Sequence, residues 1–341
     1  MSRRGAMLLG LLGAGAGYAI SRRRRAIDLE GRVAVVTGGS RGLGMLVARE
    51  MLQRGCRVAI CAREGEELTR AAAILAEDGD VFAVGADITL PDDVASLFRR
   101  VDELWGPVDI LVNNAGIIEV GPSSTMSVDD FRRVMEVNFW GMVNMIQEAV
   151  PSMRKQGFGR IANITSIGGR MSVPHLLPYG CAKFAAVGLS EGLHAELARD
   201  WIVVTTVVPG LMRTGSPVHA EFRGRPEEEY AWFSVASSSP LMSMDARRAA
   251  RRIVRAIERG EAVTTLSWQA KLATRVHGVA PGTVSRMLGA VNRFLPVQED
   301  GAPARGPIRG GTLEVPTSVA RLTRRMRRAA MRNNEVVTVE G

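Results

Sequence analysis

The sequence has few cysteines, and their positions exclude two classes of small stabilised protein. Cys56, Cys61 and Cys181 are the three cysteines among 341 residues, and none shares a Cys-x-x-Cys spacing with another. A small, odd number argues against a disulfide framework, and the missing spacing argues against a structural zinc site. We interpret all three as reduced thiols. At 46% hydrophobic and 23% charged residues, the chain is also not disordered throughout.

The body of the chain lacks an excess of charge, although the whole protein carries a net charge of +9. Residues 1–25 hold six arginines and no acids, and residues 296–341 hold eight arginines against five acids. The region between them is therefore balanced. Because a nucleic-acid-binding face needs clustered basic residues, we expect no nucleic-acid partner.

A long apolar run is also missing. The uncharged stretch from Gly5 to Ile20 covers only about sixteen residues, short of the ~20 that span a bilayer. Four arginines follow it without a convincing cleavage site, so a secretion signal is a poor fit. Residues 1–25 are predicted to anchor the chain to a membrane facing the cytoplasm. The alternative is a glycine-rich leader on a cytoplasmic protein.

The end of the chain is predicted to be a flexible basic tail over residues 296–341. Glycine and proline are frequent after Pro296, as in linkers. Within residues 318–332, apolar side chains recur at helical spacing among arginines, namely Val319, Leu322, Met326 and Ala330. This pattern predicts an amphipathic helix on an acidic lipid surface, or else a solvated tail.

Between the ends, short apolar runs alternate with helical stretches, which predicts an α/β fold. The apolar runs are Val33–Val36, Val58–Cys61, Val81–Val84, Ile110–Val112, Ile161–Ile164, Val203–Val208 and Ala262–Leu266. Strands that are apolar along their whole length are buried on both faces. We therefore predict one domain over residues 26–295, a doubly wound (Rossmann) parallel sheet of about seven strands with helices on both faces.

A glycine-rich turn follows the first predicted strand and opens the first predicted helix. It consists of Thr37, Gly38, Gly39, Ser40, Arg41, Gly42, Leu43 and Gly44. Glycines in this position let the backbone approach a pyrophosphate, and the helix N-terminus supplies amide donors. The second strand ends at Arg63, where an NAD-binding protein usually has a carboxylate. Arg63 and Arg41 suit a 2′-phosphate, so NADP(H) is predicted over NAD.

Three polar residues further along form a candidate catalytic group. Tyr179 and Lys183 are four residues apart on a predicted helix and therefore share a face. An ammonium within ~4–6 Å favours a phenolate, so Lys183 is expected to lower the pKa of Tyr179 and make it an acid and base near neutrality. Ser166 follows the strand before that helix, where its hydroxyl can donate to a substrate oxygen.

In their order and spacing these motifs resemble the short-chain dehydrogenase/reductase family, over about Gly31 to Leu266. The further matching residues are Asp87, Ile88, Asn113, Asn114, Ala115, Gly116, Asn138, Pro209, Gly210 and Thr214. The resemblance implies that Asp87 and Ile88 hold the adenine, that Asn114, Ala115 and Gly116 close the cofactor cleft, and that Pro209, Gly210 and Thr214 hold the nicotinamide end. It also implies that Asn138 steadies a water that relays protons from Lys183, and that the protein is a homo-oligomer.

The residues after the Pro-Gly pair are predicted to cover the substrate. Leu211–Asp245 is rich in apolar and methionine side chains, which either line a pocket for a hydrophobic substrate or only pack the segment onto the sheet. We predict an NADP(H)-dependent oxidoreductase that interconverts a carbonyl and an alcohol on a lipid-, sterol- or retinoid-like small molecule. The alternatives are a non-catalytic dinucleotide-binding redox sensor and a membrane-anchored interaction protein.

Overall fold

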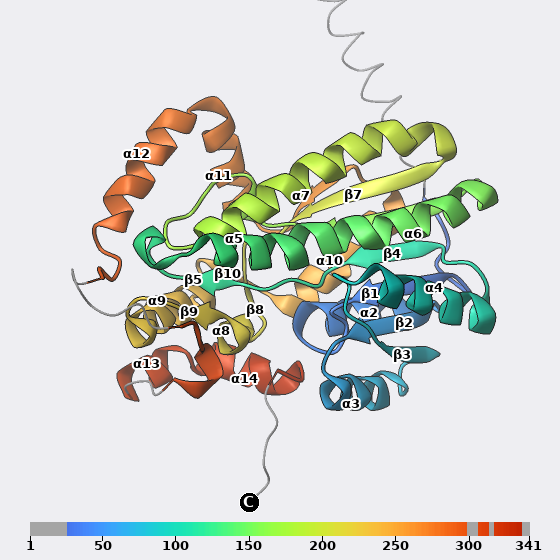
Figure 1. Ribbon diagram of the computed structural model, residues 1–341, viewed down its shortest axis with the longest axis horizontal. Helices are drawn as coiled ribbons and strands as arrows, with labels where there is room; N and C mark the ends of the chain where they lie inside the picture. Colours follow the sequence, from blue (N-terminus) through green and yellow to red (C-terminus); the bar gives the residue numbers. More distant parts are fainter. Residues whose placement is uncertain (1–25, 299–305, 314–316, 336–341) are drawn as a thin grey trace, which may run out of the picture.

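A seven-stranded parallel sheet forms the centre of the protein, with strand order β11-β7-β6-β4-β1-β2-β3 (Figure 1). The computed structural model describes residues 26–298, 306–313 and 317–335. The strands are β1 (Val33–Thr37), β2 (Arg57–Ala62), β3 (Val81–Gly85), β4 (Ile110–Asn113), β6 (Gly159–Ile164), β7 (Ile202–Val208) and β11 (Val263–Thr265). The doubly wound sheet expected from the sequence is thereby confirmed.

Helices cover both faces of the sheet because alternate residues of each strand point to opposite sides. In β1, Ala34 and Val36 belong to one core, whereas Val33 and Val35 belong to the other. The first core includes α2 (Gly42–Leu52), α3 (Gly65–Leu75) and α10 (Ala246–Arg259). The second includes α4 (Pro91–Trp105), α6 (Gly141–Gln156) and α7 (Leu177–Glu196). Every residue of β1 is buried, which explains its unbroken apolar sequence.

The strand order reverses beside β1, and this reversal positions the site. The chain runs from β1 through β2 to β3 on one side and then returns to β4 on the other. Neighbouring crossover helices therefore lie on opposite faces and leave a crevice at the carboxyl ends of β1 and β4. The glycine-rich turn follows β1 at this point.

Smaller elements lie over the carboxyl ends of the strands. They form a three-stranded sheet, β12-β9-β5, and a two-stranded sheet, β10-β8. The elements are β5 (Glu119–Val120), α5 (Val128–Met135), β8 (Leu211–Arg213), α8 (Ser216–His219), β9 (Glu221–Phe222), α9 (Pro226–Ser238), β10 (Ser243–Asp245) and β12 (Ile308–Arg309). A third core, which includes Phe222, Tyr230 and Phe233, joins β5, β9 and α9.

The last helices differ from the predicted tail. Residues 318–332 were expected to form one amphipathic helix, but the structure has two, α13 (Thr317–Leu322) and α14 (Arg324–Arg332). Met326 and Ala330, two of the four residues expected to face lipid, are buried instead. Helix α14 packs on α9 and β8, so this part of the tail is joined to the body.

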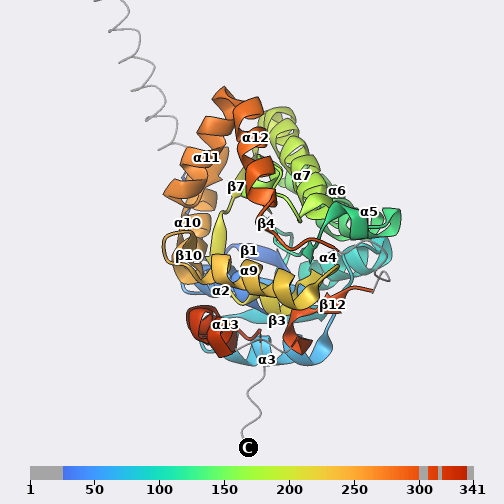
Figure 2. The same cartoon turned by 90° about the vertical axis from the view of Figure 1, so that its left-hand side faces the viewer.

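Two more helices, α11 (Trp268–Val279) and α12 (Pro281–Asn292), form a hairpin that projects beyond the sheet in both views (Figures 1 and 2). Among the residues described, none of the helices is both long and apolar enough to cross a bilayer. The predicted anchor from Gly5 to Ile20 lies outside the described residues.

Candidate active site

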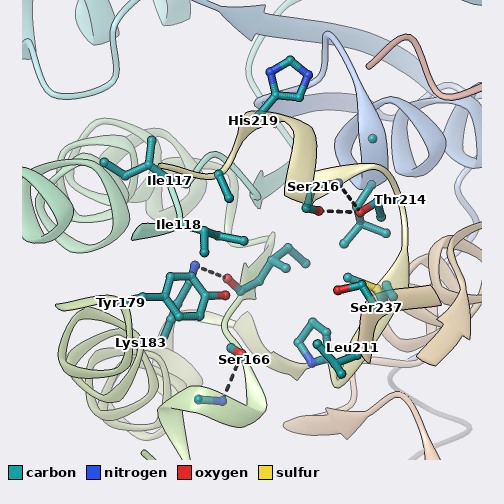
Figure 3. Close-up of a pocket in the computed structure, with 18 of the residues that line it drawn as sticks. Ile117, Ile118, Ser166, Tyr179, Lys183, Leu211, Thr214, Ser216, His219 and Ser237 are labelled. Carbon is teal, nitrogen blue, oxygen red and sulfur yellow. Dashed lines mark hydrogen bonds between the residues drawn. The ribbon is translucent and has the colours of Figure 1, made fainter. Parts of the chain in front are cut away.

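Tyr179, Lys183 and Ser166 line one cavity at the carboxyl end of β6 (Figure 3). Tyr179 and Lys183 lie in the first two turns of α7, and Ser166 follows β6 after one residue. The Lys183 ammonium nitrogen is 5.7 Å from the centre of the Tyr179 ring and donates to the Ile164 carbonyl at 3.0 Å. The Ser166 hydroxyl oxygen accepts from the Gly168 amide at 3.0 Å. The structure therefore brings the three predicted groups together.

The acidity of the Tyr179 phenol differs from the sequence-based expectation. Burial raises the pKa of Tyr179 above its ordinary value, and a hydrogen bond with Ser166 lowers it by less. Burial also lowers the pKa of Lys183 to about 8. The expected lowering of the Tyr179 pKa by Lys183 is corrected here, because the cost of burying a phenolate outweighs it and the ammonium is directed at a carbonyl. Tyr179 thus keeps its proton near neutral pH and is suited to donate it.

Asn138 supports the site from behind the cavity wall. It lies in a short π-helical turn, η2 (Glu136–Trp140), and is 1% exposed. Its Oδ1 accepts from the Ile117 amide, and its Nδ2 donates to the Ile117 carbonyl, both at 2.9 Å. These bonds hold the loop that follows β4. The predicted water relay through Asn138 stays a prediction.

The glycine-rich turn is tied to the loop after β4 by hydrogen bonds. Thr37 Oγ1 accepts from the amides of Asn114 and Ala115 at 2.9 and 3.0 Å, and Asn114 Nδ2 donates to the Thr37 and Gly38 carbonyls at 3.0 and 3.2 Å. A Cβ atom at Gly44 would lie 2.1 Å from the Gly38 carbonyl oxygen. Glycine at this position therefore permits α2 to begin directly beneath the turn. The N-terminus of α2 then points at the cavity, as a pyrophosphate site requires.

Both arginines predicted to bind a 2′-phosphate line the cavity and contact carboxylates. Arg41 forms an ion pair with Glu67 at 2.6 Å, and Arg63 lies 3.7 Å from Asp87. The Ser40 hydroxyl donates to the same Glu67. Glu67 lies in α3 with no motif around it, so no pattern in the sequence marks it as a site residue.

The last described residues reach the cavity beside the glycine-rich turn, at what we call its phosphate end. No pattern in the sequence predicted this contact. The Asn333 carbonyl accepts from the Gly42 amide at 2.9 Å, and the Asn334 side chain donates to the Ser40 carbonyl at 2.8 Å. Glu335 lines the cavity, where its carboxylate is 3.4 Å from the His219 imidazole and 4.0 Å from Arg41. No local sequence pattern could reveal contacts between residues 294 positions apart.

Glu335 brings a buried carboxyl group to the end of the cavity beside the glycine-rich turn. Burial raises the pKa of its carboxyl to about 7, so the group becomes neutral as the pH falls below that value. Burial also lowers the pKa of the neighbouring His219, while Arg41 and Glu67 are the other charged groups facing the carboxylate. Protonation of Glu335 removes repulsion toward an anionic ligand.

We expect Glu335→Gln to tighten binding of an anionic dinucleotide by about tenfold at pH 8 and by less at pH 6, since one repulsive charge pair removed from a partly buried site contributes on the order of 1 kcal/mol. Fluorescence titration of NADPH at both pH values measures this. Glu340→Gln is a control near the end of the chain. Equal dissociation constants for wild type and Glu335→Gln at pH 8 would contradict the expectation.

The cavity has a volume of about 770 Å³ and runs from the glycine-rich turn to the α11–α12 hairpin. The predicted residues that line it are Gly38, Ser40, Arg41, Gly42, Leu43, Arg63, Asp87, Ile88, Asn114, Ala115, Gly116, Ser166, Tyr179, Lys183, Pro209, Gly210 and Thr214. Thr37, Gly44 and Asn138 lie behind this lining and pack or hydrogen-bond against it. The site residues therefore line or support a single cavity.

The segment Leu211–Asp245 both lines the cavity and packs the body. Its cavity-lining apolar residues are Leu211, Met212, Trp232, Phe233, Leu241 and Met242. Phe222 and Tyr230 are buried in the third core instead. Phe233 does both, since it lines the cavity and belongs to the third core.

Comparisons with known proteins agree with this geometry. The sequence model described as short chain dehydrogenase matches residues 32–221. A dehydrogenase/reductase SDR family protein 7-like from Anopheles gambiae is 35% identical, over 59% of this chain and 65% of that relative. A putative ketoacyl reductase from Streptomyces coelicolor is 36% identical, over 57% of this chain and 75% of its own length. A crystal structure of a putative gluconate dehydrogenase from Agrobacterium tumefaciens has a TM-score of 0.62 and 28% identity, with 70% of this chain and 95% of that chain covered.

Proposed function

Because the chain belongs to the short-chain dehydrogenase/reductase family, whose members are oxidoreductases that bind a nicotinamide dinucleotide, we propose that it interconverts a carbonyl and an alcohol with NADP(H) on a hydrophobic substrate. The observation that carries this proposal is the single cavity shared by Tyr179, Lys183, Ser166 and the glycine-rich turn. A proton donor, an oxygen-binding hydroxyl and a phosphate-binding turn are the parts that such a reaction needs.

Ser166, Tyr179 and Lys183 have separate roles in the proposed reaction. When bound, the nicotinamide supplies a hydride to a carbonyl carbon or accepts one from an alcohol carbon. Ser166 donates a hydrogen bond to the substrate oxygen, and Tyr179 gives that oxygen the proton that completes the alcohol. In the reverse direction Tyr179 takes the proton from the alcohol. The positive charge of Lys183 lies near the phenol of Tyr179. It stabilises the phenolate that remains when Tyr179 has given up its proton.

Residues along the remaining cavity would hold the cofactor. The turn from Gly38 to Gly44 and the N-terminus of α2 suit the pyrophosphate, while Asp87 and Ile88 suit the adenine. Pro209, Gly210 and Thr214, which also line the cavity, would hold the nicotinamide end. Arg41 and Arg63 support the choice of NADP(H), because both side chains reach the cavity beside the end of β2 and can pair with a 2′-phosphate.

The wall of the substrate end favours apolar molecules. The side chains there include Met171, Val173, Leu176, Leu211, Trp232 and Met242. Apolar walls with a few polar groups at one end bind a greasy body and orient a single oxygen. This arrangement supports a lipid-like carbonyl or alcohol as the substrate class.

A screen of ketones of increasing chain length tests the proposal, with oxidation of NADPH and of NADH measured in parallel. We expect kcat/KM to rise about fourfold for each added methylene that the cavity buries, since each contributes ~0.8 kcal/mol. Arg63→Ala is expected to lower kcat/KM for NADPH about tenfold and to leave the NADH reaction unchanged, because it removes one charge-assisted hydrogen bond of ~1.5 kcal/mol.

Arg99→Ala is the matched control for Arg63→Ala, because Arg99 is exposed on α4 and lies outside the cavity lining. It should leave kcat/KM for both cofactors unchanged. Two results would count against the proposal. A preference for sugars or hydroxy acids would reject the substrate class, and equal use of both cofactors by wild type would reject NADP(H).

A further inference from the structure

The α11–α12 hairpin carries an outward apolar face. On α11, Trp268, Leu272, Val276 and Val279 follow one another at helical spacing and are all exposed, Trp268 at 67% and Val279 at 87%. Beside α12, Phe294 is 89% exposed. Isolated exposed apolar residues are ordinary, but a stripe along one helix together with an exposed phenylalanine beside the next marks a surface that another apolar phase covers.

The opposite side of the same hairpin lines the cavity. Ala270 and Ala273 of α11 face it, as do Leu288 of α12 and Leu295 just beyond it. Val291 of α12 belongs to both sides, since it lines the cavity and is also exposed. The outer apolar face and the cavity wall therefore meet at Val291.

The hairpin is also basic and free of acidic residues. Between Glu261 and Glu299 the sequence contains no aspartate or glutamate. The cations in this stretch, Lys271, Arg275 and Arg286 on the two helices and Arg293 at the end of α12, are exposed, and none has an ion-pair partner among the residues that the structure describes. An apolar stripe flanked by unpaired cations matches an anionic lipid surface.

Charge repulsion disfavours two alternatives that could cover this apolar face, a second copy of the hairpin and residues 1–25 of the same chain. A second copy of the hairpin would bring four further cations against these four, which is unfavourable without any acid between them. The chain's own residues 1–25 carry six arginines and no acids, so they are repelled in the same way. Exposed tryptophan and phenylalanine, by contrast, are the side chains typical of the boundary between headgroups and acyl chains.

We propose that the α11–α12 hairpin docks on the surface of an anionic membrane and admits the substrate from the bilayer to the cavity between its two helices. Trp268, Val279 and Phe294 enter the acyl region, and the cations contact lipid phosphates and carboxylates. The docking is inferred only from the exposed apolar residues and cations of the hairpin, whereas the path of the substrate rests on the proposed function.

Quenching of tryptophan fluorescence by brominated lipid tests the docking in the full-length protein. Residues 1–25 and 296–341 contain no tryptophan, so quenching does not report on either end of the chain. With vesicles of phosphatidylserine and brominated phosphatidylcholine, we expect the tryptophan emission of wild type to fall. The fractional loss of emission should be at least about twofold smaller for Trp268→Phe. Trp201→Phe is the matched control, because Trp201 is 77% exposed at the opposite end of β7.

Quenching of Trp268→Phe as strong as that of wild type, or no quenching of wild type, would overturn the proposal. If the hairpin is instead buried between two copies of the chain, the emission of wild type is not quenched. Sedimentation velocity then identifies the dimer. Lys271→Glu combined with Arg275→Glu should raise the lipid concentration needed for half-maximal quenching at least about tenfold. Arg247→Glu with Arg251→Glu, equally spaced and exposed on α10, should leave it unchanged.

The substrate path has a separate test. Trp268→Ser combined with Phe294→Ser should slow reduction of a long-chain ketone delivered in vesicles about tenfold and leave reduction of a short, soluble ketone unchanged. Neither residue lines the cavity. Equal slowing of both ketones would refute the path. If wild type reduces neither ketone, the proposed function fails while the quenching result for the docking still stands.

Discussion

Tyr179→Phe is expected to lower kcat for carbonyl reduction by about 10²- to 10⁴-fold, the usual contribution of a positioned acid or base. Phenylalanine keeps the ring that packs in the cavity and removes only the hydroxyl. Because burial keeps the Tyr179 phenol protonated near neutrality, its proton is available for the substrate oxygen. Steady-state oxidation of NADPH measures the loss, and fluorescence titration should show cofactor affinity within about twofold of wild type.

Tyr230→Phe is the matched control for this substitution. Tyr230 is buried in the third core and does not line the cavity, so loss of its hydroxyl should leave kcat unchanged. A Tyr179→Phe protein with the turnover of wild type would show that another group supplies the proton. Loss of cofactor binding in Tyr179→Phe would instead indicate that the substitution had altered the cavity.

Gly44→Ala is expected to reduce both the stability of the fold and the affinity for the dinucleotide. The added Cβ would lie 2.1 Å from the Gly38 carbonyl oxygen and 2.5 Å from the Asn114 amide nitrogen. The first of these is backbone, so the turn itself must shift away from α2. Overpacking of this kind costs about 1–3 kcal/mol in the free energy of unfolding. Displacement of the turn should weaken NADPH binding at least about tenfold, since its amides and α2 form the phosphate site.

Gly188→Ala separates this steric effect from the general effect of replacing glycine. Gly188 lies within α7, and a Cβ there would have no atom within 4 Å. Alanine at this exposed helical position should raise the free energy of unfolding by up to about 1 kcal/mol. Chemical denaturation measures both variants, and equal stability of Gly44→Ala and wild type would show that the turn adapts without strain.

Periodicity in the sequence was sufficient to predict the sheet because its five central strands are almost wholly buried. The apolar run from Val33 to Val36 can pack only between two layers of helices. The edge strands β3 and β11 are only partly buried, and their runs were recognised because they continue the same alternation of strand and helix. Helix α7 begins at Leu177, and Pro178 lies in its first turn, where the fixed φ of proline is favourable.

Long-range contacts were outside the reach of sequence reasoning. Glu67 meets Arg41 because α3 folds back beside the glycine-rich turn, and Glu335 reaches the same arginine from the end of the chain. Neither carboxylate stands in a motif. The electrostatics of the phosphate end of the cavity therefore follow from packing, which no local pattern encodes.

The order of residues along the chain by itself determined which family the protein belongs to, where its strands lie, and that Tyr179 and Lys183 share one helical face, because all of these depend on spacing alone. Burial, which exists only in the folded protein, decided that the Tyr179 pKa is raised rather than lowered. Folding also decided that Glu335 lies in the cavity and that a basic, apolar hairpin borders its substrate end, since these depend on which distant segments meet.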